Sequence, residues 1–282
     1  GSAATIIDLV PTAPGFIVQP IYLHYEGDAS ASTGVPIIGK VAASLNAKSD
    51  VALLGGFYTF EQTVLGAHYS VGSFVPYMWV EVTGEIDTAL GDRSRTDSAS
   101  GLGDITLIPA MLAWKSGFWQ YSALAPIYTP TGDYSTDSLA NPGLNYWTVD
   151  PTLSVSYNNA ETGFNATLFG GVTYNTENNA TNYESGSMMH FDGSVQQLLP
   201  VGPGFLGVGV EGFYFEQVTG DSGSGAKSGN FEGRTMGAGP VLSYILPLGE
   251  QTFVTELRWL PESNVEKRLS GDYIWLKFAY VL

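Results

Sequence analysis

The sequence predicts an all-β protein, a closed antiparallel transmembrane β-barrel of about 12 strands. Apolar and polar residues alternate with a period of two along most of the chain, and short connections alternate with long ones. The chain also has no apolar run long enough for a transmembrane helix. A chain that crosses a membrane without such helices must close its strands into a barrel, because every backbone N–H and C=O needs a partner in hydrocarbon.

Twelve segments carry the alternating pattern and are expected to form the strands. They are residues 16–28, 51–62, 68–87, 101–114, 118–131, 144–157, 163–176, 186–199, 205–218, 231–246, 252–260 and 272–282. An even number of strands places both ends of the barrel chain on the same side of the membrane.

The connections between these strands differ in length in a regular order. The short ones are 64–67, 115–117, 158–162, 200–204 and 247–251. The long ones, rich in Asp, Ser, Asn, Gly and Thr, are 29–50, 88–100, 132–143, 177–185, 219–230 and 261–271. Short periplasmic turns and long polar extracellular loops are typical of barrels in the bacterial outer membrane, which is the predicted location. A single barrel domain is expected over residues 1–282, with residues 1–15 as a periplasmic or lumenal segment.

The two faces of each strand differ in polarity, and three features favour lipid on the apolar face. Trp, Tyr and Phe residues lie at the ends of the apolar faces, near the expected membrane interfaces. Carboxylates recur on the polar faces, and a dry core could not hold them unpaired. The last predicted strand, Ile274 to Leu282, is apolar at every second position. A soluble all-β binding protein is the alternative, and it would stay in solution without detergent.

The polar faces define a predicted lumen lining and substrate path. Its residues are Tyr77, Trp79, Glu81, Glu85, Asp104, Trp114, Tyr146, Asp150, Phe169, His190, Asp192, Glu211, Phe213, Glu256, Arg258, Trp275 and Lys277. Arg258 is expected to form a cross-strand charge network with Glu256, Glu211 and Lys277. The aromatic members suit apolar or aromatic molecules, although they could equally serve to fill a narrow barrel.

The composition excludes several classes of protein. The chain has 27 acidic and 11 basic residues, a net charge of −16, so nucleic acid is not an expected partner. It has no Cys, which excludes disulfides and Cys-based metal sites, and no cofactor or metal site is expected.

His190, Asp192 and Ser194 are the residue types of a hydrolase triad and lie at every second position of one predicted strand. Residues at i and i+2 of a strand stand about 6.6 Å apart, too far for the hydrogen bond between a nucleophile and its base. These residues are therefore interpreted as polar lumen lining, and no enzyme is expected.

Prolines fall inside several predicted strands, where each removes a hydrogen bond of the ladder. They are Pro20, Pro76, Pro109, Pro126, Pro151 and Pro240. Bulges at Pro76, Pro109 and Pro126 would lie in neighbouring strands. The hypothesis is a gap in the wall there, through which an apolar molecule leaves sideways.

Short motifs are spread along the chain. They are Gly101-Leu102-Gly103-Asp104-Ile105, Ala125-Pro126, Pro130-Thr131-Gly132-Asp133-Tyr134, Asn141-Pro142-Gly143, Tyr146-Trp147, Asp150-Pro151 and Gly170-Gly171-Val172. From Phe16 to the end, the chain with these motifs resembles the phenol meta-pathway degradation family of outer-membrane channel proteins. The resemblance implies a twelve-stranded monomeric channel for small hydrophobic molecules, with Asp104, Asn145 and Asp150 as lumen candidates.

The resulting expectation is a monomeric outer-membrane channel for passive uptake of small hydrophobic or aromatic compounds, with an amphipathic, net-acidic lumen. Its expected partners are those compounds together with outer-membrane lipid and lipopolysaccharide. The alternatives are a general porin for small polar solutes and a hydrolase built into the barrel wall.

Overall fold

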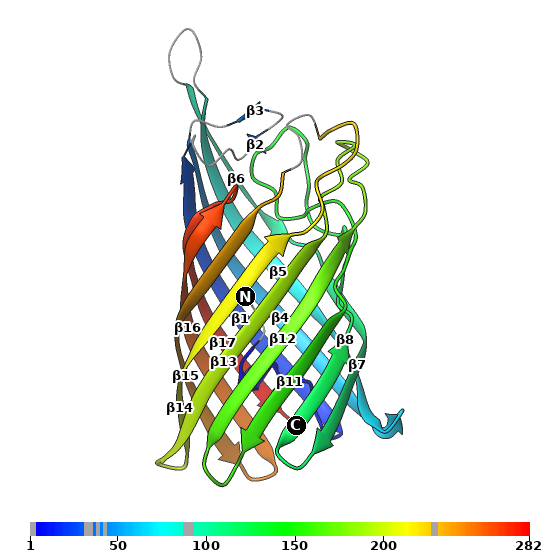
Figure 1. Cartoon of the computed structure of the whole chain (residues 1–282), viewed down its shortest axis with the longest axis vertical. Coiled ribbons are helices and arrows are strands. Elements are labelled where there is room, and N and C mark those ends of the chain that lie inside the picture. The colour runs from blue at the N-terminus through cyan, green and yellow to red at the C-terminus, as the bar shows by residue number, and fades with distance from the viewer. Residues whose placement is uncertain (1–3, 31–35, 38–39, 42–43, 87–92, 227–230) are drawn as a thin grey trace.

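The computed structural model describes residues 4–30, 36–37, 40–41, 44–86, 93–226 and 231–282. Its strands form a closed antiparallel barrel with twelve strand positions, as the sequence predicts (Figure 1). The barrel closes where β1 (Gly15–Ser30) pairs antiparallel with β17 (Ser270–Val281). Closure leaves no strand edge to face hydrocarbon.

Nine of the twelve positions are continuous strands. Besides β1 and β17 they are β4 (Ser44–Val64), β5 (Ala67–Ile86), β12 (Phe164–Asn175), β13 (Met188–Val201), β14 (Gly204–Gln217), β15 (Arg234–Leu248) and β16 (Gln251–Glu266). The other three positions are each broken in two: β6 (Arg93–Leu102) and β7 (Thr106–Ser116), β8 (Trp119–Leu124) and β9 (Ile127–Tyr128), and β10 (Thr148–Val149) and β11 (Thr152–Asn159). A separate pair, β2 (Pro36–Ile37) and β3 (Lys40–Val41), and a 3-10 turn, η1 (Ile6–Asp8), complete the elements.

Three predicted loops are wrong in part, because strands continue through them. β4 begins at Ser44 and β6 at Arg93, although the sequence pattern predicts long loops for both stretches. β16 runs to Glu266 and β17 starts at Ser270, so the predicted loop 261–271 is mostly strand. These extensions lie at the end of the barrel away from the short turns, where both faces meet water (Figure 1). The apolar alternation that marks a membrane strand is therefore missing from them.

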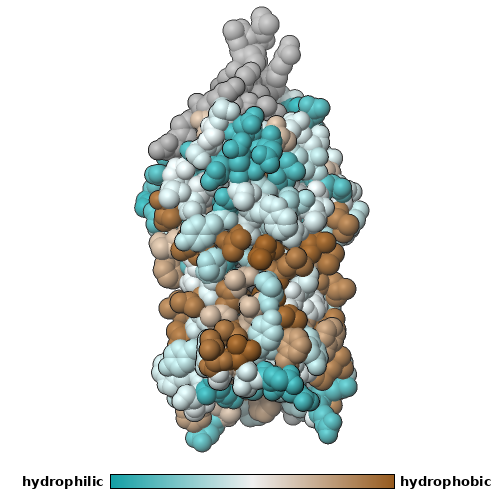
Figure 2. All heavy atoms as spheres, turned by 90° about the vertical axis from the view of Figure 1, so that its right-hand side faces the viewer, coloured by the Kyte–Doolittle hydropathy of each residue, from teal (hydrophilic) through white to brown (hydrophobic). Residues whose placement is uncertain are grey.

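The outer surface carries an apolar belt between two polar zones (Figure 2). Leu54, Leu153 and Val210 are among the exposed apolar side chains of this surface. Near the periplasmic turns the belt ends in aromatic rings, where Trp119 and Phe164 both contact Tyr157. An apolar belt bordered by aromatic residues is the surface of a barrel that spans the outer membrane. No helix in the described part of the chain has the length and apolar character to cross a membrane.

The three broken positions lie side by side in the wall. The break between β8 and β9 contains Pro126, and the break between β10 and β11 contains Pro151. Scattered backbone hydrogen bonds still span the breaks, among them those from Asp150 N to the Pro126 carbonyl at 2.9 Å, from Gly103 N to the Pro76 carbonyl at 3.0 Å and from Thr129 N to the Ile105 carbonyl at 3.0 Å. The ladder in this part of the wall is thus interrupted, as the prolines predict. Pro109 lies inside β7, where the pairing with β5 shifts register between Ser70 and Gly72. Pro76 lies inside the continuous strand β5 and pairs with Leu53 without a register shift, so no bulge is present there. Pro20 and Pro240 also lie inside continuous strands, at exposed positions.

Candidate functional site

The N-terminal segment, residues 4–14, runs inside the barrel and is called the plug segment below. The Thr5 hydroxyl donates to a Glu256 carboxylate oxygen on β16 at 2.8 Å. The Gln120 side-chain amide on β8 donates to the Val10 carbonyl at 2.7 Å. Because these contacts reach different strands of the barrel, the plug segment lies across the lumen, and its dark blue trace is within the barrel in Figure 1.

A buried charge cluster fixes the plug segment to the wall. Arg258 is 0% exposed and pairs with Glu211 at 2.6 Å and with Glu256 at 2.9 Å. Asp8 of the plug segment pairs with Arg258 at 3.1 Å and with Lys277 at 2.5 Å. The wall alone contributes two cations and two carboxylates, and Asp8 adds a third carboxylate. Such a cluster specifies one position of the plug segment, because moving Asp8 away would leave its charge unpaired in the lumen.

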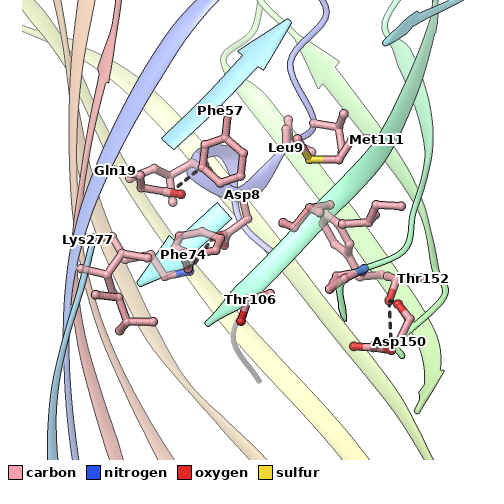
Figure 3. Close-up of a pocket in the computed structure, with 18 of the residues that line it drawn as sticks. Asp8, Leu9, Gln19, Phe57, Phe74, Thr106, Met111, Asp150, Thr152 and Lys277 are labelled. Carbon is pink, nitrogen blue, oxygen red and sulfur yellow. Dashed lines mark hydrogen bonds and ion pairs between the residues drawn. The ribbon is translucent and has the colours of Figure 1, made fainter. Parts of the chain in front are cut away.

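A cavity of about 320 Å³ lies between the plug segment and the wall (Figure 3). Most of its lining is apolar, including Phe57, Phe74, Ile108, Met111, Phe169 and Trp275. These side chains come from strands on both sides of the lumen because inward positions alternate with lipid-facing ones. The volume and the apolar lining match those of a site for a small organic molecule.

The cavity has one polar wall, which consists of His190 between two carboxylates. His190 Nε2 lies 3.0 Å from Asp150 Oδ1, and His190 Nδ1 lies 3.2 Å from Asp192 Oδ2. Thr152 donates to the same Asp150 oxygen at 3.3 Å, and the two lie opposite Asp8 and Lys277 across the cavity (Figure 3). With both carboxylates ionised, each ring nitrogen donates a proton and the imidazole is cationic.

The hydrolase interpretation finds no support in this arrangement. The Ser194 hydroxyl donates to the Ala4 carbonyl of the plug segment and not to His190. A nucleophile needs a base within hydrogen-bond reach, and the described residues place none on Ser194. Within the described part of the chain, no three His, Asp or Glu side chains are grouped as metal ligands either.

Gly171 on β12 makes room for the polar wall. A Cβ at this position would overlap His190 Nε2 and would come within 2.5 Å of Thr152 Oγ1 and 2.9 Å of Asp150 Oδ1. Any side chain larger than a hydrogen would therefore push the three polar groups apart.

Gly171→Ala is expected to lower the free energy of unfolding by about 1–3 kcal/mol, the usual range for overpacking a tight site. Urea unfolding in lipid vesicles measures the change. Gly193→Ala is the matched control on the neighbouring strand, since its Cβ would meet nothing closer than 3.5 Å. Equal stability of the two variants would contradict the close packing around His190.

The family model for the MetA-pathway of phenol degradation matches residues 29–278. The chain belongs to this family. The match covers every strand of the barrel from β4 onwards except the last residues of β17. It confirms the family resemblance predicted from the scattered turn and strand motifs.

Solved structures extend the comparison to three dimensions. The COG4313 outer membrane channel from Pseudomonas putida F1 is 19% identical, with a TM-score of 0.73 over 97% of each chain. The beta domain of the Bordetella autotransporter BrkA is 8% identical, with a TM-score of 0.55 over 96% of this chain and 100% of that domain. At these identities the likeness concerns the barrel fold. The comparison with curated proteins gives no significant match.

Ten of the predicted lumen residues of this phenol-degradation family member do point into the barrel. Five line the central cavity: Asp150, Phe169, His190, Asp192 and Trp275. Lys277 lines the cavity and also belongs to the charge cluster with Glu211, Glu256 and Arg258, while Phe213 packs against Leu260 and Trp275. The expected network around Arg258 is present, but sequence reasoning missed Asp8, because the plug segment has no strand pattern.

Four predicted lumen residues lie on the outer surface instead. Tyr77 and Trp79 on β5 are 40% and 48% exposed, and Glu81 on the same face is exposed as well. Phe74, on the opposite face, lines the cavity. The carboxylates of β5 predict a lumen-facing side, but this strand extends beyond the membrane, where an outward carboxylate meets water. The fourth residue, Trp114, donates from Nε1 to the Leu65 carbonyl beside a periplasmic turn.

The remaining three residues do not line the cavity. Asp104, at the break between β6 and β7, accepts hydrogen bonds from Gly132 N at 2.9 Å and Leu144 N at 2.8 Å. It therefore anchors the connection from β9 to β10. Tyr146 is part of that connection and is half-buried. The side chain of Glu85 lies outside the described residues.

Extracellular loops of this family member are held by local polar contacts. The Leu139 backbone N–H, followed by the Arg95 guanidinium, lowers the pKa of Asp97. Burial, followed by a hydrogen bond to Asp221, raises the pKa of Tyr183. The loops gather at the end of the barrel opposite the short turns (Figure 1). The ionised Asp97 thus links β6 to the connection between β9 and β10.

Proposed function

We propose that this protein is an outer-membrane channel for the passive uptake of small hydrophobic or aromatic compounds. The observation that carries the proposal is the apolar cavity in the middle of the lumen, lined by Phe57, Phe74, Phe169 and Trp275. A lumen built only for water and polar solutes has no need of an apolar chamber. The similarity in fold to an outer membrane channel of Pseudomonas putida F1 supports the same role.

A general porin for polar solutes fits the interior less well. The plug segment crosses the lumen, and the space beside it is an apolar chamber of about 320 Å³ rather than a wide aqueous pore. Small apolar molecules gain free energy by leaving water for such a surface, whereas sugars lose hydrogen bonds there. The cavity therefore favours apolar cargo over hydrated cargo.

The lumen is amphipathic and net acidic. Among the described residues around the cavity and the charge cluster, the carboxylates are Asp8, Asp150, Asp192, Glu211 and Glu256, and the cations are His190, Arg258 and Lys277. Fixed carboxylates in a confined space repel anions, so neutral molecules and cations are favoured over anions.

Two exits lead from the cavity in this proposal. One runs past the plug segment to the periplasm and requires Asp8 to leave its cationic partners. The other runs sideways through the interrupted wall, where Pro126 and Asp150 line the cavity directly beside the break. The lateral exit would deliver an apolar molecule into lipid, where it is most soluble.

Uptake by intact cells tests the proposed function. Gram-negative cells that contain an intracellular aromatic oxygenase would consume 4-ethyltoluene several-fold faster when their outer membrane holds this protein. Vesicles that contain the same protein would show little swelling with glucose. Fast swelling with glucose and no gain in 4-ethyltoluene consumption would support the general porin and overturn the proposal.

A further inference from the structure

The carboxylate of a buried residue, Asp150, lines the apolar cavity, and one of its oxygens has no donor among the described residues. Asp150 is 7% exposed and lines the cavity. Its Oδ1 atom accepts from His190 at 3.0 Å and from Thr152 at 3.3 Å. None of the described residues donates to its other oxygen, Oδ2. A desolvated carboxylate oxygen is stabilised strongly by any donor that reaches it, because charge-assisted hydrogen bonds are about twice as strong as neutral ones.

The positive groups around the cavity are already engaged. Among the residues that line it, His190 and Lys277 are the cations. His190 contacts Asp150 and Asp192, and Lys277 contacts Asp8 at 2.5 Å. An anionic ligand would therefore meet carboxylates and would have to displace one of them to reach a cation.

The packing around this carboxylate points to a built site rather than an incidental charge. Gly171 leaves the space in which Asp150, His190 and Thr152 meet, since its Cβ would strike all three. Asp150 itself lies at the break between β10 and β11, and its backbone N–H is held by the Pro126 carbonyl at 2.9 Å. The position of the Asp150 carboxylate is thus set by a hydrogen bond of its backbone and by the contacts of its side chain with His190 and Thr152.

We propose that the Asp150 carboxylate, oriented by His190, is a hydrogen-bond-accepting subsite that selects apolar molecules with one neutral O–H or N–H donor. The donor binds Asp150, and the apolar body of the ligand packs on the surrounding surface of Met111 and Phe169. This inference rests on the proposed function and names the class of molecule that the cavity prefers. Phenols, alcohols and aromatic amines belong to the class, and the corresponding carboxylates do not.

The expected selectivity follows from comparing three ligands of similar shape that differ in the group placed beside Asp150. A neutral donor gives Asp150 the hydrogen bond that it lacks. A methyl group in the same place leaves the carboxylate desolvated and unpaired on that side. A ligand carboxylate adds a repulsive charge next to Asp150 and Asp192. Sites built to bond a hydroxyl reject analogues without it for the same reason.

Equilibrium binding to the wild-type protein in lipid nanodiscs tests the subsite with 4-ethylphenol, 4-ethyltoluene and 4-ethylbenzoate at neutral pH. The expected order of affinity is 4-ethylphenol first, by about tenfold over 4-ethyltoluene, with 4-ethylbenzoate last. Equal affinities of 4-ethylphenol and 4-ethyltoluene would overturn the subsite while leaving the proposed function intact. Absence of binding by both neutral ligands, together with no gain in cellular uptake, would overturn the proposed function itself.

The variant Asp150→Asn assigns the preference to this residue. It is expected to lower the affinity for 4-ethylphenol about tenfold, to the level of 4-ethyltoluene, and to leave 4-ethyltoluene unchanged. Glu161→Gln, on an exposed periplasmic turn, makes the same change of charge outside the lumen and should have no effect. An unchanged preference for 4-ethylphenol in a folded Asp150→Asn barrel would overturn the assignment. The wild-type comparison of ligands decides the proposal even where the variant does not fold.

Discussion

Deletion of residues 4–11 is expected to raise the single-channel conductance in planar bilayers several-fold. These residues form most of the plug segment and supply Ile7, Asp8, Leu9, Val10 and Pro11 to the floor of the cavity. The wall that remains is balanced in charge, because Arg258 and Lys277 stay beside Glu211 and Glu256. We therefore expect the barrel to fold without the plug segment and to conduct through a wider lumen.

Asp8→Asn refines the same prediction. It keeps the shape of the side chain but removes the charge that Arg258 and Lys277 bind. Brief transitions to the high conductance of the deletion are expected, since the plug segment loses both ion pairs and is held by hydrogen bonds such as those of Thr5 and Val10. Asp133→Asn in an extracellular loop is the control and should conduct like the wild type. A deletion that conducts no better than the intact chain would show that the plug segment does not block the lumen.

Arg258→Met is expected to destabilise the barrel by about 3–5 kcal/mol, the usual cost of breaking a buried ion pair from one side. Arg258 is surrounded by Glu211, Glu256 and Asp8, so its loss leaves three carboxylates with Lys277 as their remaining cation. Urea unfolding in lipid vesicles measures the difference from the wild type.

Arg95→Met is the matched control, because Arg95 also pairs with a carboxylate but lies exposed in the extracellular extension of β6. Its loss should change the free energy of unfolding by less than about 1 kcal/mol. Replacing Glu211 by Gln together with Arg258→Met should recover part of the stability, since one unpaired charge disappears. Equal losses for Arg258→Met and Arg95→Met would contradict a desolvated charge cluster.

The membrane-spanning part of the fold could be predicted because each strand there has one face in lipid and one in the lumen. This arrangement produces the alternation of apolar and polar residues along each strand. The alternation of short and long connections shows in addition which end of the barrel each turn lies at. The parts of β4, β6 and β16 outside the membrane could not be predicted, since water on both faces imposes no alternation. The prolines indicated the interrupted wall, although Pro20 and Pro240 show that a proline at an exposed position need not break a strand.

The residues of the candidate site could be predicted only on strands where polar side chains point into the lumen and apolar side chains point to lipid. On β13 and β16 the face toward the lumen is polar and the face toward lipid is apolar. The sequence therefore predicts the direction of His190, Asp192, Glu256 and Arg258 correctly. On β5 both faces carry large apolar residues, and the carboxylates belong to the extension in water, so Trp79 was assigned to the wrong side. The plug segment and its Asp8 depend on contacts across the whole chain, which no local pattern encodes.

The central claim is that apolar molecules pass through the cavity beside the plug segment. Thr106→Trp fills that cavity, whereas Leu107→Trp places the same side chain on the lipid-facing side of β7. The initial rate of 4-ethyltoluene consumption by intact cells, measured at equal amounts of folded barrel, compares them directly. The account predicts that Thr106→Trp abolishes the gain in uptake and that Leu107→Trp retains it. Equal uptake by the two variants would contradict passage through this cavity.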